Sequence, residues 1–124
     1  MIQSGTQEPL LSELRLNPEK NILSLTFADG TAHRLSAEFL RVVSPSAEVQ
    51  GHSPSERKLV PGKRNVTIRK IEPVGNYAVR LDFSDGHNTG LYSWAYLHDI
   101  ACRKDELWTA YLDELAAAGA SRDR

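Results

Sequence analysis

One phrase occurs twice in this chain, about half a chain apart. The first copy, LSLTFADG, runs from Leu23 to Gly30, and the second, VRLDFSDG, runs from Val79 to Gly86. In both copies apolar and polar residues alternate, which is typical of a strand with one buried face. The Asp-Gly pair that closes each copy is the strongest short-range signal for a hairpin turn. The repeat therefore predicts two antiparallel hairpins of the same kind.

The elements around the two copies also match. A proline turn precedes each copy, at 17–21 and at 72–76. Ser36 follows the first copy and Ser93 the second, each as a plausible N-cap before apolar residues at helical spacing. We therefore predict an α+β fold of two β-β-β-α-like units, in which antiparallel hairpins pack with C-terminal helices.

Apolar alternation and turn residues also predict where the elements lie. The expected strands are 14–16, 22–27, 31–35, 66–71, 77–83 and 89–92. A last helix is expected to begin near Asp105, as its cap, and to stop at Gly119. Residues 44–65 carry three prolines and few large apolar side chains, so we expect a long loop, which in compact domains is usually functional or mobile.

Length and composition describe one ordinary domain. The 124 residues carry a net charge of -1 and one cysteine, Cys102, which excludes an internal disulfide. We expect a flexible N-terminal tail at 1–11, a single domain at 12–120 and a flexible C-terminal tail at 121–124. No apolar run is long enough to span a bilayer, and no export signal is evident. A cytoplasmic protein without a membrane partner is the expectation.

The sequence contains no recognised catalytic motif. It shows no Gly-rich phosphate loop, no nucleophile elbow and no Cys–His pair. Asp29 and Asp85 could form paired carboxylates for acid–base work. Each already has a local role, because Asp-Gly supplies the positive φ values of a tight turn. We therefore predict no enzymatic activity.

Four polar residues suggest a metal site as an alternative. Glu48, His52, Asp85 and His87 are chemically suited to a first-row divalent metal ion. Their spacing matches no helical metal pair, and the sequence alone favours turn and surface roles for them. No cofactor is predicted beyond such a divalent metal.

A basic stretch offers a nucleic-acid alternative. Residues 57–70 contain six Lys and Arg and no acid, which suits contact with phosphate. No RNA-binding motif accompanies the stretch, and the acidic region 99–114 balances its charge. A solvated loop and strand edge is the favoured interpretation, and nucleic acid is not the expected partner.

Four separated motifs of this chain occur in the same order as in one known family. They are LRVVSPSAEVQGH at 40–52, GKR at 62–64, IEPVGNY at 71–77 and DGHNTGLYSW at 85–94. Over about residues 12–122 the chain closely resembles the gamma-butyrobetaine hydroxylase N-terminal-like domain. Most members of that family are small bacterial proteins of unknown function. Similar domains precede the catalytic domain of carnitine-biosynthesis oxygenases, or are attached to iron–sulfur-cluster carrier ATPases.

The resemblance also implies a metal site and its loss. In those oxygenases the domain holds a structural zinc through three cysteines and one histidine. By position the cysteines fall on Ser44, Ser46 and about Val49, and the histidine falls on His87. A serine hydroxyl is a poor zinc ligand at neutral pH, so no zinc–cysteine cluster is expected here. The resemblance still places the 44–52 loop beside His87. The oxygenase catalytic domain is absent from this sequence.

These observations favour a non-catalytic protein-interaction or accessory module. The resemblance links such a role to iron–sulfur or oxygenase-related assembly, with a protein partner of unknown identity. The expected interaction surface comprises Ser44, Ser46, Glu48, Gln50, His52, Asp85, His87 and Trp94. The first alternative is a metal-binding protein that uses Glu48, His52 and His87. The second is weak nucleic-acid binding through Arg57–Lys70. No oligomeric state follows from the sequence.

Overall fold

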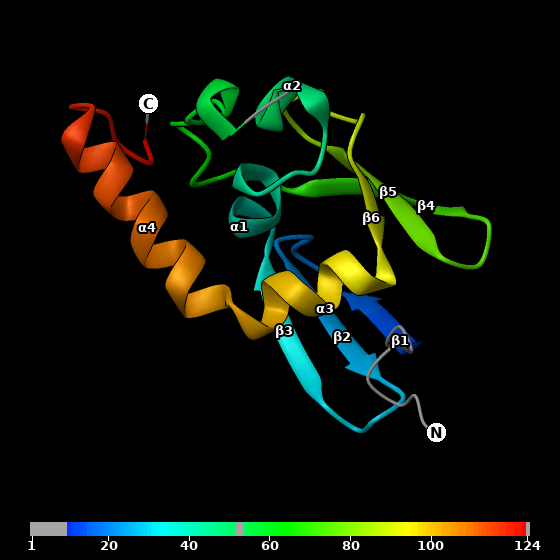
Figure 1. The fold of residues 1–124 in the computed structure, drawn as a ribbon. Helices are drawn as coiled ribbons and strands as arrows, with labels where there is room; N and C mark the ends of the chain where they lie inside the picture. Colours follow the sequence, from blue (N-terminus) through cyan, green and yellow to red (C-terminus); the bar gives the residue numbers. More distant parts are fainter. Residues whose placement is uncertain (1–9, 52–53, 124) are drawn as a thin grey trace.

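The computed structural model describes residues 10–51 and 54–123. It contains two antiparallel three-stranded sheets, in the orders β1-β2-β3 and β4-β5-β6, and the helices that cover them (Figure 1). The first unit consists of β1 (Leu11–Leu16), β2 (Ile22–Phe27), β3 (Ala32–Ser36), α1 (Ala37–Val42), α2 (Ala47–Gln50) and the 3-10 helix η2 (Pro54–Glu56). The second consists of β4 (Ile68–Val74), β5 (Ala78–Phe83), β6 (Leu91–Ser93), α3 (Trp94–Cys102) and α4 (Lys104–Ala117). The predicted α+β fold of two similar units is confirmed.

The two Asp-Gly turns have the same backbone geometry. Gly30 has a φ of +90° and Gly86 a φ of +92°, a region that L side chains rarely adopt. In each turn the preceding phenylalanine donates its N–H to the residue after the glycine, which is Thr31 in the first turn and His87 in the second. Both N···O distances are 2.9 Å. Thr31 and His87 therefore occupy equivalent positions of the repeat.

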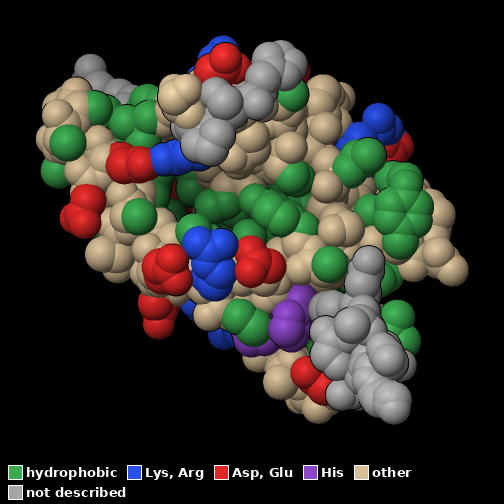
Figure 2. Space-filling view, viewed as in Figure 1, with side chains coloured by type: hydrophobic (Ala, Val, Ile, Leu, Met, Phe, Trp, Pro, Cys, Tyr) green, Lys and Arg blue, Asp and Glu red, His purple; other side chains and the backbone are tan. Residues whose placement is uncertain are grey.

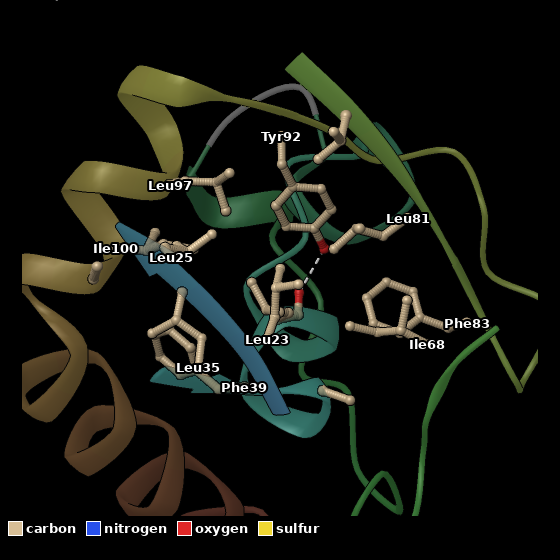
Figure 3. Packing of buried hydrophobic residues seen from close by; sticks show 14 of the residues in the cluster. Leu23, Leu25, Leu35, Phe39, Ile68, Leu81, Phe83, Tyr92, Leu97 and Ile100 are labelled. Carbon is tan, nitrogen blue, oxygen red and sulfur yellow. Dashed lines mark hydrogen bonds between the residues drawn. The ribbon is translucent and has the colours of Figure 1, made fainter. Parts of the chain in front are cut away.

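The central strands, α1 and α3 share the main hydrophobic core, and Tyr111 and Leu115 of α4 form a smaller cluster with Val42 of α1. Leu23 from β2, Phe83 from β5 and Leu97 from α3 are fully buried within the main core (Figure 3). Tyr92 from β6 also reaches into this core, where its hydroxyl donates to the carbonyl of Leu40 in α1 at 2.6 Å. This bond links the two units, and burial raises the pKa of the Tyr92 hydroxyl far above its ordinary value.

The helix caps are confirmed in part. Ser36 and Ser93 accept from the backbone N–H three residues later, as expected of N-caps. By contrast, α4 begins at Lys104 directly after α3, without a side-chain cap, so Asp105 lies inside the helix. The expected cap was wrong because α3 and α4 are almost continuous in the chain. Gly119, with a φ of +68°, follows the end of α4 as predicted.

Several element boundaries differ from the predicted ones. β1 begins at Leu11, inside the expected tail, because Leu11 pairs with the far end of β2. β4 runs from Ile68 to Val74, since its pairing with β5 continues to the turn that joins the two strands. The expected loop at 44–65 contains α2, whose N-cap Ser46 accepts from the backbone of Glu48. In each case pairing or capping fixes the ends.

The residues expected to form a C-terminal tail contact the domain. Ser121 accepts from the backbone N–H of Gly62 at 3.0 Å. Arg122 binds Glu38 of α1 through two hydrogen bonds of 2.8 and 2.7 Å. The end of the described chain thus lies beside the segment that precedes β4 (Figure 1). Within the described residues, no helix combines the length and the apolar character needed to cross a membrane.

Candidate functional site

Three polar side chains converge where the two units meet. The loop between α1 and α2 carries Ser44, α2 carries Glu48, and the turn after β5 carries His87. His87 Nε2 lies 2.8 Å from Ser44 Oγ, and His87 Nδ1 lies 3.1 Å from Glu48 Oε1. The predicted proximity of the 44–52 loop to His87 is therefore seen in the structure, although 43 residues separate Ser44 from His87.

The chemistry of the partners fixes the direction of these bonds. An ionised carboxylate only accepts, so His87 Nδ1–H donates to Glu48. Burial of the imidazole, followed by the nearby Arg41 charge, lowers the pKa of His87, while Glu48 opposes the shift. The ring is therefore neutral at pH 7, and its Nε2 accepts from the Ser44 hydroxyl. Ser44 Oγ in turn accepts from the backbone N–H of Ser46 at 3.2 Å. No buried side-chain polar atom of Ser44 or His87 is therefore left without a partner.

Neighbouring residues hold this network in place. Ser46 Oγ lies 2.6 Å from Thr89 Oγ1, and Gln50 Nε2 donates to the Ser44 carbonyl at 2.7 Å. Gly90 has no side chain, and a Cβ there would lie 2.5 Å from Ser44 Oγ. Thr89 and Gly90 were missed as site residues, because nothing local in the sequence indicates that they face Ser44 and Ser46.

Asp85 forms the second part of the site. Its Oδ2 accepts from Arg41 Nε at 2.9 Å and from Lys63 Nζ at 2.6 Å. Burial alone would raise the pKa of Asp85, but the Lys63 ammonium, the His87 backbone N–H and Arg41 together lower it to about 2. Asp85 is thus ionised at neutral pH. Arg41 and Lys63 were also missed, because the turn itself gives Asp85 a complete local role.

A cavity of about 330 Å³ opens beside this site. Its lining includes the cations Arg41, Lys58 and Lys63, together with Glu48 and His87. We call this cavity the cationic hollow. It is the place where His87, which is otherwise buried, forms part of a surface.

A second cavity, of about 290 Å³, is lined by apolar side chains of α1, α3 and α4. Figure 2 shows hydrophobic side chains at the floor of a hollow with charged side chains around it. The charges at the rim of this cavity pair with one another, Arg57 with Glu114 and Arg103 with Asp99. The cationic hollow therefore has the stronger electrostatic signature of the two.

The Ser44–His87–Glu48 arrangement has the connectivity of a hydrolase triad, in which histidine activates a serine and a carboxylate orients the histidine. Such a nucleophile must meet a substrate carbonyl. Ser44 is 0% exposed, and its Oγ is enclosed by the backbone of Ser46 and by Gly90. The arrangement is therefore a structural hydrogen-bond network rather than a catalytic one.

Metal ligation competes with these hydrogen bonds. Both ring nitrogens of His87 already have partners, and His52 lies outside the described residues. Among residues 10–51 and 54–123, no group of three or more His, Cys, Asp or Glu side chains is arranged to hold a metal ion. The expected absence of a Cys–His pair is wrong, because His98 and Cys102 lie one turn apart on α3 with Sγ 3.9 Å from both ring nitrogens. No third ligand in the described chain completes that pair.

The remaining predicted residues lie apart from the network. Trp94 Nε1 donates to the carbonyl of Asn76 at 2.8 Å, and its ring packs against the main core. The contacts that join Ser44, Glu48 and His87 do not include it. In the basic stretch, Arg64 pairs with Asp123 and Lys70 with Glu72. Pairing with acids favours a structural role for much of this stretch.

Comparison with known proteins identifies the family of this chain. The family described as gamma-butyrobetaine hydroxylase-like, N-terminal, matches residues 14–98. The chain belongs to this family. Two solved NMR structures are similar to this chain, each with 48% sequence identity. The first match covers 94% of this chain and 92% of the other, with a TM-score of 0.81. The second covers 98% of this chain and 91% of the other, with a TM-score of 0.80. No match was found among curated proteins.

A crystal structure from Acidithiobacillus ferrooxidans is also similar. That protein is described as having unknown function and as belonging to the DUF971 family. It is 38% identical, covers 73% of this chain and 91% of its own, and has a TM-score of 0.61. The family assignment predicted from the motifs is confirmed.

The zinc site that the resemblance implies does not fit this family member. The positions of the cysteines carry two hydroxyl groups, on Ser44 and Ser46, and the buried aliphatic side chain of Val49. Only His87 keeps a nitrogen ligand, and both of its nitrogens are hydrogen-bonded. Zinc prefers thiolate and imidazole ligands. Here Ser44 and His87 are hydrogen-bonded to each other, and His87 also to Glu48.

We expect acid to weaken this network. The folded-state pKa of His87 lies below its unfolded value of about 6.5, so the unfolded chain binds more protons. The contribution of His87 to stability is therefore complete above about pH 6.5 and is lost as the pH falls through the folded pKa. Urea unfolding at pH 5 to 8 measures this. The stability difference between wild type and His87→Ala should be smaller at low pH, and a constant difference would contradict the neutral ring.

Proposed function

We propose that this family member is a non-catalytic accessory module that binds a partner protein through the face formed by α2 and the turn at 85–87. One observation carries the proposal. Ser44 and His87, the groups that could react, are hydrogen-bonded to each other. The side chain of Glu48, which also contacts His87, is 63% exposed. A buried network thus supports an exposed charged surface beside the cationic hollow.

Side-chain contacts between distant segments support a role of this face in recognition. Ser46 is hydrogen-bonded to Thr89, and Arg41 and Lys63 pair with Asp85. A surface that is ordered before binding loses less conformational entropy when a partner docks. The resemblance to domains attached to larger proteins supports a partner in iron–sulfur or oxygenase-related assembly.

Site-specific photo-crosslinking tests this proposal. A benzophenone side chain at Ala47, which is exposed on α2, is expected to give a discrete product with one protein in an extract of the source cells. Excess unlabelled protein should suppress that product. The same group at Arg69, which is exposed on β4, serves as the matched control and should give none. Equal products from both positions, or no product from Ala47, would contradict the proposed face.

A further inference from the structure

The charges around the cationic hollow do not balance. Arg41 and Lys63 share a single carboxylate, that of Asp85. Lys58 lines the same cavity and makes no ion pair with any described residue. Against these three cations stand Asp85 and Glu48, so the hollow keeps one excess positive charge. An excess cation at a partly enclosed surface attracts an anionic ligand more strongly than one in open water does.

Arg41 is the least accessible of these cations. Its side chain is 12% exposed, and its Nη1 is buried without a partner among the described residues. Lys58 is exposed and the Lys63 side chain is 22% exposed. These two lysines are therefore the cations that a ligand in the hollow can reach.

The rest of the lining is apolar. Val49, Leu59, Val60 and Pro61 complete the wall of the cavity. A wall of this kind buries an aliphatic side chain next to the bound anion, and a nucleic-acid backbone offers no such side chain. The lining therefore matches a protein segment better than a chain of phosphates.

We propose that the cationic hollow binds an acidic segment of a partner protein, with a carboxylate at Lys58 and Lys63 and a neighbouring apolar side chain against Leu59 and Pro61. This inference rests on the proposed function and names the chemistry of the partner. Charge attraction steers the segment to the hollow, and burial of the apolar side chain holds it there. Binding should weaken as salt is added.

A peptide titration followed by NMR tests the inference. The probe is the blocked peptide acetyl-Leu-Asp-Leu-Glu-Leu-amide, and its neutral control carries Asn and Gln in place of Asp and Glu. At millimolar peptide, the acidic probe should selectively shift the backbone amide signals of residues 48, 58–60, 62, 63 and 87. Lys58→Glu should raise the dissociation constant about tenfold or more, because it reverses a charge that faces the ligand. Arg69→Glu, an equal charge change on exposed β4, should bind like wild type.

Three results would overturn the inference. They are equal shifts with the neutral peptide, no selective shifts at millimolar peptide, and equal loss of binding in Lys58→Glu and Arg69→Glu. If a single-stranded oligonucleotide bound at the same residues more tightly than the acidic peptide, the ligand of the hollow would be nucleic acid rather than an acidic protein segment. If the crosslink from Ala47 forms and the acidic peptide neither binds nor suppresses it, the proposed function stands and this inference fails.

Discussion

Replacement of His87 by alanine is expected to lower the free energy of unfolding by about 3 kcal/mol. The change removes both hydrogen bonds of the imidazole and leaves the Ser44 hydroxyl buried without its acceptor. It also leaves a cavity where a side chain that is 3% exposed was packed. Urea unfolding at pH 7.5 measures the loss.

The repeat supplies a matched control for this variant. Thr31 occupies the position equivalent to His87 in the first Asp-Gly turn, but it is exposed and bonds only within its own turn. Thr31→Ala should therefore cost about 0.5 kcal/mol. Equal losses in the two variants would mean that the second turn stabilises the protein only through its local geometry. That result would contradict the structural role assigned to the Ser44–His87–Glu48 network.

Replacement of Arg122 by alanine is also expected to cost about 3 kcal/mol. Glu38 is 5% exposed, and both of its carboxylate oxygens accept from Arg122. The arginine also lies over the Trp108 ring at 5.2 Å. Without it a carboxylate stays buried and unpaired, which is far costlier than the loss of an exposed pair. Thermal or urea unfolding measures the effect.

A neighbouring ion pair provides the comparison. Asp123, the residue after Arg122, pairs with Arg64, but both side chains of this pair are largely exposed. Arg64→Ala should cost less than about 1 kcal/mol. Adding Glu38→Gln to Arg122→Ala should recover part of the larger loss, because it removes the unpaired charge. If Arg64→Ala and Arg122→Ala were equally mild, the C-terminal segment would contribute nothing specific to the fold.

Sequence reasoning succeeded where a signal is local. The alternation around Leu23 and Val79 predicts the strands, and Asp-Gly predicts their turns, because neighbouring residues alone decide those conformations. The serine caps and the stop at Gly119 follow from backbone groups within one helical turn. Asp105 fails as a cap for the opposite reason. The start of α4 depends on how closely it follows α3, and a cap residue alone does not reveal that.

The candidate site was predicted in outline only. The family motifs indicate that the 44–52 loop lies near His87, and the structure brings Ser44 and Glu48 to that ring. The sharing of Asp85 by Arg41 and Lys63 could not be predicted, since these groups come from three different segments.

By itself, the sequence of this family member determined two repeated strand–turn–strand units, their serine caps and the absence of the three zinc-binding thiolates. Each of these depends on residue identity or on spacings of a few residues. Only the tertiary structure decided that His87, although its turn matches that of Thr31, is buried against Ser44 and Glu48. The two copies share a local geometry, but they pack against different neighbours, and packing between distant segments determines burial, charge pairing and the cationic hollow.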